Sequence, residues 1–538
     1  MARARRLFSP LAAGARRPGR LPCRDRPRRP PFPAHGPAMR VPLPTGKQMS
    51  STHTPRLSSA ALARLPAGIA VPAYDRAATR IGIVHFGPGA FHRAHQAVYL
   101  DDLLALDPAW AISAVSLHSA SVRDALAPQD GLYTLVLLGE QPALRVVGSI
   151  REVLCAPQQR EAVAARLADP DVRLVTLTIT EKGYCLSADG VDAAHPDIAH
   201  DLANPQAPVS AIGWLVEGLR LRRARGLPAY TVLSCDNLAD NGGRLRRAVF
   251  DYAGRVDAEL AEWIAREVAF PRSMVDSITP ATDDGVRAQV QSALGVADAW
   301  PVQREPYTQW VVEDDFRNGR PPLERAGVVM SGDIAGYDRA KLRLLNAPHS
   351  ALAYLGSLME LESVAEAMRD PVLAGFVERL MRQDIVPSLQ RPEGFDPEAY
   401  VGAILARFRN PAIRHLLAQI AWDGSQKIPV RLLGTIADAL AAGRPIDRLC
   451  LPVAGWLQFV RRQAARDVAI VDPLAETLAQ IGKACTGDVA RDVNAFLALD
   501  GVFGTLAGDA RFAAVLGEAY AALDPATPEA VRLALAAA

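Results

Sequence analysis

Short runs of apolar and β-branched residues recur along the first half of the chain. They lie at 79–86, 109–117, 132–138, 172–180 and 230–235. A strand that is covered on both faces is apolar at nearly every position, so these runs predict buried parallel strands. Helical spacing at 161–168 and 209–226 separates several of them. The alternation favours an α/β domain with a doubly wound parallel sheet, in which a ligand lies beyond the carboxyl ends of the strands.

From about residue 330 the pattern changes, and helical spacing replaces most strand-like runs. Helix-like stretches lie at 372–386, 400–409, 412–421, 431–443 and 451–463. Apolar residues that recur every three or four positions are typical of helices that pack on one face. We therefore expect a sheet domain at 75–330, followed by a mostly α-helical C-terminal domain at 331–538.

The first strand-like run leads directly into the segment GPGAFHR and then into a helix-like stretch at 94–106. This order is the context of a Rossmann-like dinucleotide-binding turn, because glycines let the backbone approach a pyrophosphate and the helix start offers free N–H groups. The candidate cofactor-binding residues are Gly87, Pro88, Gly89, Ala90, Phe91, His92 and Arg93. His92 replaces the third glycine of the usual motif, so a tight strand-to-helix turn without a cofactor is the alternative.

The end of the second strand-like run carries no marker that identifies the cofactor. An acidic residue there usually binds the ribose hydroxyls of NAD, and residues 115–119 contain none. No cluster of arginines indicates NADP either, although Arg123 lies a few positions further on. The residues alone therefore do not choose between NAD and NADP.

Two polar clusters fall at the carboxyl ends of strand-like runs. One is TEKGY at 180–184, and the other is SCDNL at 234–238. Turn formation explains the Asn241-Gly242 pair that follows the second cluster. It explains the CDN segment less well, since that segment leaves a buried strand directly. Both clusters are therefore candidates for the ligand-binding edge of the sheet.

The composition is that of an ordinary globular protein. The chain has 538 residues and a mass of 57.7 kDa, with 49% hydrophobic and 22% charged residues, which excludes wholesale disorder. No apolar run is long enough for a transmembrane helix. The six cysteines form no CxxC pair, so we expect no structural zinc and reduced thiols in a cytoplasmic protein.

The first 50 residues differ from the rest of the chain. They carry eleven arginines and one lysine against one aspartate, a net charge of +11, which leaves −9 for the remainder. Such a basic, proline-rich segment predicts disorder. A transit-like presequence and a basic arm for nucleic acid are two interpretations. Because prolines break a presequence helix and the remainder is acidic, we favour a third, sequence ahead of a later start at Met39 or Met49.

A lysine, an asparagine and a histidine are spaced along one segment near the domain junction. On a helix at about 100° per residue, Lys341, His349 and Asn346 lie at about 0°, 80° and 140°, on one broad face. A lysine that is desolvated in a cleft loses basicity and can take a proton from an alcohol. Asn346 can then donate to the developing alkoxide. Pro348 supports an alternative, in which the helix is kinked and Lys341 is solvated.

These motifs together resemble the polyol-specific long-chain dehydrogenases, the family of mannitol dehydrogenase and fructuronate reductase. The matching segments are GPGAFHRAHQ, TITEKGYC, SCDNLADNGG, FPRSMVDSITP, KLRLLNAPHS and DGSQKIP. They span residues 75 to about 430, and the lysine–x4–asparagine–x2–histidine spacing is the hallmark of the family. The resemblance implies a nucleotide-binding domain, a helical domain and metal-independent chemistry with NAD, NADP being left open.

The resemblance also implies a role for each matching residue. Lys341 matches the general base, and Asn237 and Asn346 match the amides that hold the substrate oxygen. Asp338 stands where the family often has a glutamate. Contacts with substrate hydroxyls are implied for His349, Asp276 and Lys427. The partners expected are a small sugar acid or polyol, with neither nucleic acid nor membrane, and the protein is expected to be a monomer.

The substrate expected from the resemblance is a sugar acid. Segment 419–431 is similar to the fructuronate reductase branch, because Gln419 stands where the mannitol branch tends to carry an arginine. Lys427 and Arg431 offer positive charge for a carboxylate, although Arg431 can also face solvent. We therefore expect interconversion of D-mannonate and D-fructuronate, with mannitol 2-dehydrogenase or another polyol dehydrogenase as the alternative. A non-catalytic nucleotide-binding protein is the alternative of another class.

Overall fold

The computed structural model describes residues 54–139, 141–187 and 190–538. Segment 1–50, for which disorder is predicted, lies outside the described residues. In the described ranges we find no helix with the length and apolar character that crossing a bilayer requires.

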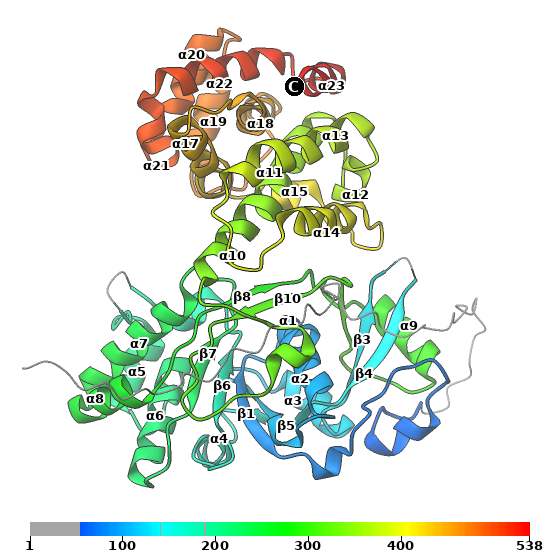
Figure 1. Ribbon diagram of the computed structural model, residues 1–538, viewed down its shortest axis with the longest axis vertical. Helices are drawn as coiled ribbons and strands as arrows, with labels where there is room; N and C mark the ends of the chain where they lie inside the picture. The colour runs from blue at the N-terminus through cyan, green and yellow to red at the C-terminus, as the bar shows by residue number, and fades with distance from the viewer. Residues whose placement is uncertain (1–53, 140, 188–189) are drawn as a thin grey trace, which may run out of the picture. The chain divides into compact units, whose positions relative to one another are not determined.

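A five-stranded parallel sheet forms the centre of the N-terminal half (Figure 1). Its strand order is β5 (Ile150–Cys155), β2 (Ala111–Ser116), β1 (Ile81–Phe86), β6 (Leu174–Leu177) and β7 (Thr231–Ser234). The chain adds strands outward on one side of β1 and then crosses to β6 on the other side. The order therefore reverses between β1 and β6, where doubly wound sheets bind their ligands. The predicted α/β architecture is confirmed.

Side chains of β1 enter two separate apolar clusters, one on each face of the sheet. Val84 and Phe86 pack with residues of α6 (Ala211–Ala224) and α7 (Asn241–Val256). Ile83 packs instead with residues of α2 (Gln96–Leu103) and with Leu126 of α3 (Ser121–Leu126). Successive side chains of a strand point to opposite faces. Burial of both faces explains why the run that predicted β1 is apolar at most of its positions.

The predicted strand at 132–138 does not belong to this sheet. β3 (Tyr133–Leu137) pairs antiparallel with β4 (Ala143–Val147) and parallel with β9 (Val302–Arg304) in a sheet of its own. The outer position beside β2 belongs instead to β5, which the sequence pattern did not indicate. Its sequence, IREVLC, includes two charged residues, so no continuous apolar run marks it.

Two further parts complete the N-terminal half. A third sheet consists of β8 (Ser273–Asp276), β10 (Gln309–Val312) and β11 (Val329–Met330). Ahead of residue 75, Leu57 and Ala61 are buried in an apolar cluster with Leu132 and Val136. The folded chain therefore begins before residue 75, since these side chains cover part of the second sheet.

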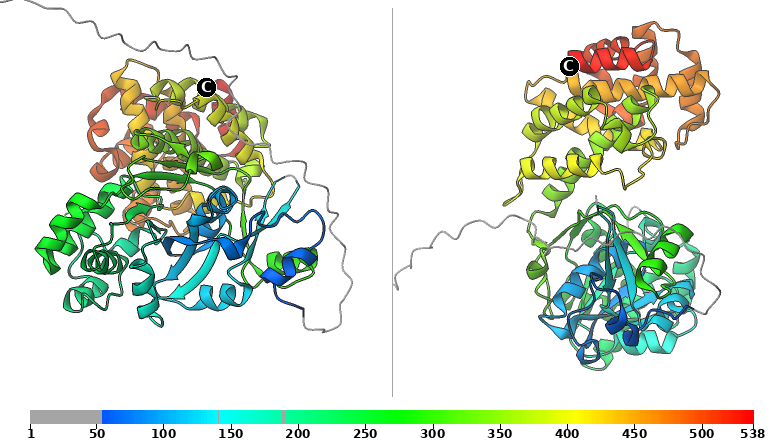
Figure 2. Two further views of the ribbon diagram at one scale, coloured as in Figure 1. Left: turned by 60° about the horizontal axis from the view of Figure 1, so that its bottom comes forward. Right: turned by 90° about the vertical axis from the view of Figure 1, so that its right-hand side faces the viewer.

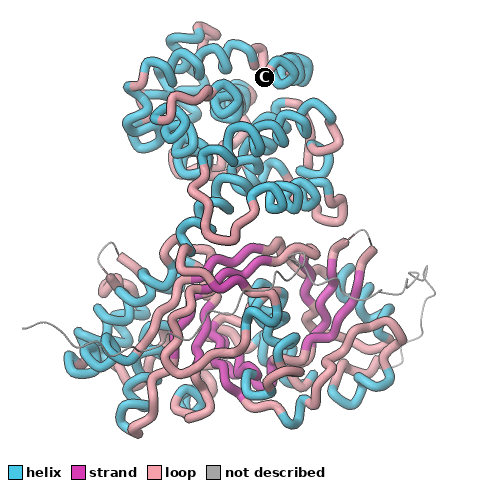
Figure 3. The backbone as a smooth tube through the Cα atoms, in the orientation of Figure 1, coloured by secondary structure: helices cyan, strands magenta, loops and turns pink. Residues whose placement is uncertain are grey.

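Beyond β11 the described chain is helical from α10 (Ile334–Lys341) to α23 (Pro528–Ala537), apart from one isolated bridge. Figure 3 shows the strands confined to the N-terminal half, and in both views of Figure 2 the yellow-to-red part of the chain is drawn as helices and loops. The predicted helical C-terminal domain is confirmed.

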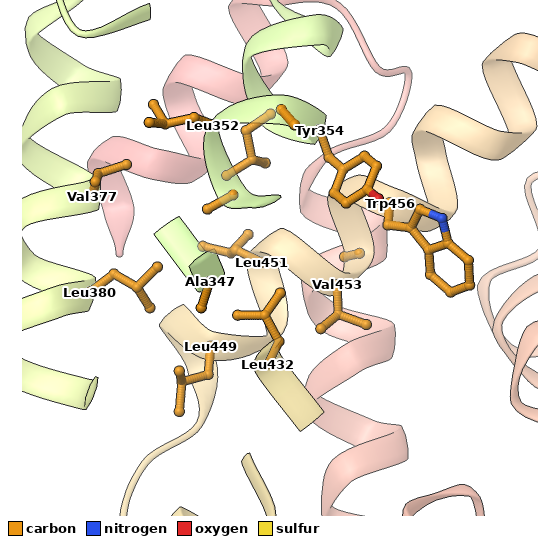
Figure 4. Packing of buried hydrophobic residues seen from close by; sticks show 14 of the residues in the cluster. Ala347, Leu352, Tyr354, Val377, Leu380, Leu432, Leu449, Leu451, Val453 and Trp456 are labelled. Carbon is orange, nitrogen blue, oxygen red and sulfur yellow. The ribbon is translucent and has the colours of Figure 1, made fainter. Parts of the chain in front are cut away.

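The core of the helical domain forms around α11 (Ala347–Leu358) and α18 (Asp447–Ala465). Both helices are buried on most of their circumference. Figure 4 shows Tyr354 of α11 beside Trp456 of α18, and Leu352 and Leu451 belong to the same apolar cluster. A β-carbon at Gly455 would lie 2.9 Å from the Leu355 side chain, so glycine allows this close packing. The start of α11, which carries His349, is therefore fixed in a rigid core.

A π-helical turn, η7 (Leu342–Asn346), joins α10 to α11 and keeps the backbone helical from 334 to 358. Pro348 lacks an N–H and its ring would clash inside a regular α-helix. Wider turns of this kind relieve such conflicts and occur often at functional sites. The helix is therefore not broken at Pro348, although its angular spacing differs from the uniform 100° assumed for the sequence.

Candidate active site

Lys341 ends α10 and extends its amine to the edge of the sheet domain. Its Nζ donates to Asn237 Oδ1 at 2.7 Å and to the backbone carbonyl of Val275 at 2.6 Å. Asn237 follows strand β7, and Val275 belongs to β8. The side chain of Lys341 is buried, with 8% of the residue exposed. The structure thus brings together two predicted site residues that are 104 positions apart in the sequence.

The surroundings of Lys341 lower the basicity of its amine. Burial lowers the pKa of Lys341, the nearby Arg407 lowers it further, and the carboxylates of Asp276 and Asp338 oppose this shift. Burial also raises the pKa of Asp338 to about 6. A lysine that is neutral near physiological pH can accept a proton from a hydroxyl group.

His349 lies on the first turns of α11 and is buried. Its ring lies 4.5 Å from that of Phe408 and 5.0 Å from that of His415, between centroids. Burial, followed by the nearby His415, Arg407 and Arg431, lowers its pKa well below the usual value. Within the described residues its Nε2 has no hydrogen-bond partner. A neutral imidazole with a free ring nitrogen is suited to bind a substrate hydroxyl.

Asp276 takes part in a buried ion-pair cluster that the sequence did not indicate. Arg407 donates to both carboxylate oxygens of Asp276, at 2.6 and 3.2 Å, and to both of Glu305, at 2.8 and 2.7 Å. The three side chains are at most 6% exposed. Asp276 was predicted to contact substrate, and in the structure its carboxylate is paired with Arg407. One sequence feature could have indicated a buried charge here, since Arg407 is the single charged residue in the otherwise apolar stretch YVGAILARF.

Lys427 and Arg431 lie on the next helical segments, α16 (Gly424–Ile428) and η10 (Pro429–Leu433). Lys427 Nζ donates to the Ile420 carbonyl at 3.3 Å. Arg431 donates to Ser350 Oγ at 3.1 Å and to the Asn346 carbonyl at 3.4 Å. The guanidinium therefore contacts α11 and η7, and Arg431 is partly exposed.

The glycine turn has one closed side and one open side. Gly87 has φ +88°, and a β-carbon there would lie 2.2 Å from the Thr178 carbonyl oxygen. Gly89 caps α1 (Ala90–Ala94), is exposed, and a β-carbon there would meet nothing nearer than 3.9 Å. The backbone at Gly89 therefore offers the close approach that a pyrophosphate needs, and Pro88, Ala90 and Phe91 flank it.

His92 and Arg93 lie beneath this turn, which corrects their prediction as cofactor contacts. His92 is fully buried and stacks on His85 with 3.3 Å between ring centroids. Arg93 donates to the carbonyls of Pro88 and Trp300, at 3.3 and 2.6 Å, and only 1% of it is exposed. Both side chains are buried and pack against the turn, His92 through the ring of His85 and Arg93 through the Pro88 carbonyl.

The two polar clusters at the strand ends meet, as adjacent strands β6 and β7 require. Asp236 accepts hydrogen bonds from the backbone N–H groups of Ile179 and Thr180, at 3.0 and 2.8 Å. It also accepts one from the Tyr184 hydroxyl at 2.6 Å. Asp236 therefore fixes the loop that presents Asn237 to Lys341.

One group of potential metal ligands occurs among the described residues. Ligand atoms of Cys185, His195 and Asp197 lie within 4.8 Å of one another. Burial, with nearby aspartates, raises the pKa of the Cys185 thiol to about 11. A metal ligand must be a thiolate, so any ion held here would have to displace the proton of this thiol. The expectation of metal-independent chemistry stays a prediction.

The parallel sheet with its open glycine turn and the buried lysine suit a nucleotide-dependent dehydrogenase, and the family matches identify an NAD-dependent dehydrogenase that acts on CH–OH groups. Residues 81–325 match the family model "Mannitol dehydrogenase Rossmann domain", and residues 333–524 match "Mannitol dehydrogenase C-terminal domain". The chain belongs to the mannitol dehydrogenase family, as the resemblance in its sequence implied.

The relatives of this chain include enzymes named for mannitol and for mannonate. A mannitol 2-dehydrogenase of Neosartorya fischeri is 40% identical over 460 residues, 82% of this chain and 91% of that protein. A D-mannonate oxidoreductase of Escherichia coli is 40% identical over 463 residues, 84% of this chain and 95% of that protein. The structure of Pseudomonas fluorescens mannitol 2-dehydrogenase with NAD and D-mannitol is 39% identical, has a TM-score of 0.72, and covers 89% of this chain and 98% of its own.

Proposed function

We propose that this chain oxidises a secondary alcohol of a six-carbon polyol, D-mannitol, to the ketose, with NAD as the acceptor. The observation that carries the proposal is the buried amine of Lys341, held 2.7 Å from the amide oxygen of Asn237. The relatives support the choice of substrate, since several are mannitol 2-dehydrogenases and a solved one was crystallised with NAD and D-mannitol. This choice replaces our sequence-based preference for D-mannonate.

The residues of the site supply proton transfer and orientation. Neutral Lys341 accepts the proton of the reacting hydroxyl, because burial has lowered its basicity. Asn237 accepts from Lys341 through its oxygen, which leaves its amide N–H groups to donate to the substrate oxygen. Asn346 provides a second amide, and both stabilise the alkoxide that develops in the transition state. His349 binds a neighbouring hydroxyl through its free nitrogen.

The cofactor fits the turn at Gly87–Gly89, where the backbone is open at the ligand-binding edge of the sheet. NAD, when bound, accepts the hydride from the alcohol carbon. The first residues of α1 would provide N–H groups for the pyrophosphate, whereas the Gly89 N–H donates to the Gly87 carbonyl at 2.7 Å. His92 and Arg93 keep the turn in place from below.

The test is the absorbance of reduced nicotinamide with D-mannitol, D-arabinitol, D-mannonate and D-altronate, each with NAD and with NADP. We expect the highest kcat/KM for D-mannitol with NAD. No turnover of any polyol or sugar acid by the folded protein would contradict the proposal.

A second candidate, the oxidation of D-mannonate, is favoured by one observation. Arg431 is partly buried and bonds to a hydroxyl and a carbonyl oxygen. Within the described residues no carboxylate forms a salt bridge with it, so a substrate carboxylate would suit its guanidinium. If D-mannonate is the substrate, Arg431→Met should lower its kcat/KM by about 100-fold and leave D-mannitol oxidation nearly unchanged. An equal loss with both substrates would reject a carboxylate contact.

A further inference from the structure

Two cationic side chains, Arg407 and Lys341, lie near the carboxylate of Asp276, and only Arg407 forms hydrogen bonds with it. Arg407 binds both oxygens, at 2.6 and 3.2 Å. Lys341 donates instead to the carbonyl of Val275 and to Asn237. We propose that Arg407 is a positioning residue that occupies Asp276 and so keeps the Lys341 amine from pairing with that carboxylate. This inference rests on the proposed function of Lys341 as the general base.

The geometry of Arg407 suits this task. It comes from α14 (Pro397–Arg409) of the helical domain, whereas Asp276 and Glu305 belong to the sheet domain. Its donors bind the two carboxylates in a fork, and its guanidinium lies 4.2 Å from the centre of the Tyr307 ring. A planar guanidinium can bind two carboxylates at once, which a single ammonium group does less well.

The charges around Lys341 explain why the pairing of Arg407 with Asp276 affects the protonation of the lysine. The groups that face the amine are Asp276 from β8, Asp338 from its own helix and Arg407 from α14, and the neutral imidazole of His95 lies near. Two of the three charges are negative. Without Arg407, Asp276 would be an unpaired buried carboxylate beside Lys341, and the amine would become its counterion. A lysine held as an ammonium ion cannot act as a base.

The experiment measures the protonation of Lys341 directly, without substrate. The full-length protein is exposed to reductive methylation at a series of pH values, and the modification of Lys341 is quantified by mass spectrometry. The chain has five lysines, of which the exposed Lys182 and Lys483 serve as internal references. We expect Arg407→Met to raise the pH at which Lys341 becomes reactive by at least one pH unit, about tenfold in the fraction neutral.

Charge compensation separates this role from a purely structural one. In Arg407→Met combined with Asp276→Asn, the reactivity of Lys341 should return toward the wild-type pH range. Arg409→Met, at the exposed end of the same helix, is the matched control and should leave it unchanged. A folded Arg407→Met protein with wild-type reactivity at Lys341, or a double variant that keeps the full shift, overturns the proposal.

Two further variants keep the test decisive if Arg407→Met does not fold. Arg407→Lys retains a cation and should shift Lys341 less than a neutral residue. Asp276→Asn with Arg407 intact should lower the pH at which Lys341 reacts, and no lowering would contradict the inference. Labelling needs no substrate, so it tests the role of Arg407 separately from the proposed function. If the variants shift the reactive pH of Lys341 as expected but the protein oxidises no polyol, the role of Arg407 stands and only the proposed function is rejected.

Discussion

At the scale of single residues, burial sets the chemistry of the site by changing basicity. Lys341 and His349 both have a lowered pKa because they are withdrawn from water, and burial raises the pKa of Asp338 to about 6. An amine of lowered basicity, a neutral imidazole and two amides can all exchange protons or hydrogen bonds with a polyol. The residue types were visible in the sequence, but their protonation followed from where each side chain lies.

The first prediction concerns the pH dependence of polyol oxidation. Lys341 acts as its neutral form, so kcat/KM should rise as the pH increases through the pKa of Lys341. Because burial lowers this pKa from 10.5, the inflection should fall below 10.5. Lys341→Ala should lower kcat by at least 10³-fold. Stopped-flow or steady-state assays at a series of pH values check both, with circular dichroism to show that the variant is folded. Near-normal turnover in Lys341→Ala would reject the assignment.

At the scale of elements, the site depends on how helices and strands begin and end. The turn after β1 requires a glycine at 87, where φ is +88° and the Thr178 carbonyl lies against the α-carbon. The π-helical turn η7 lets the helix run past Pro348 and carry both Lys341 and His349. Local sequence indicated the glycine turn, because its residues are adjacent. It did not indicate the π-turn, which no periodicity of 3.6 residues encodes.

The second prediction compares two glycines of the same turn. Gly87→Ala should destabilise the fold by about 2–4 kcal/mol, from the left-handed conformation and the clash with Thr178. Gly89→Ala places its methyl group in open space, so it should keep the stability and weaken NAD binding. Chemical denaturation and calorimetric titration with NAD measure the two effects. Equal stability of the two variants would contradict the geometry of the turn.

At the scale of the whole molecule, the site needs groups from both halves of the chain. Asn237 and Asp276 come from the sheet domain, whereas Asn346, His349 and Arg407 come from helices that follow Lys341. Bonds such as Asn410 Nδ2 to the Leu138 carbonyl, at 2.7 Å, also join residues of the two halves. The helical core around α11 and α18 therefore serves the chemistry indirectly, since it holds the helix that carries His349.

The third prediction concerns stability remote from the site. Leu516 in α22 (Ala510–Ala522) is fully buried in the helical core. Leu516→Ala should lower the free energy of unfolding by about 2–5 kcal/mol, because it removes apolar contacts and leaves a cavity. Leu533→Ala, at an exposed position of α23, is the control and should change it by less than about 0.5 kcal/mol. Urea titration measures the free energy of unfolding of both variants. The kcat of Leu516→Ala at low temperature should stay near the wild-type value, because the site itself is unchanged.

The sequence by itself determined the elements whose residues are neighbours in the chain. The apolar runs indicated β1, β2, β6 and β7, the glycines indicated the cofactor turn, and the spacing of Lys341, Asn346 and His349 indicated the candidate base and its helpers. Each of these signals comes from a local period or a short motif, which the physics of one strand, turn or helix imposes.

The tertiary structure decided everything that depends on distant partners. It placed β3 in a separate sheet, turned His92 and Arg93 beneath the turn, and paired Asp276 with Arg407. A buried charge must find an opposite charge wherever the fold brings one, and the partner of Asp276 lies 131 positions away. No local pattern records such a pairing, because it arises only when the two halves of the chain have folded against each other.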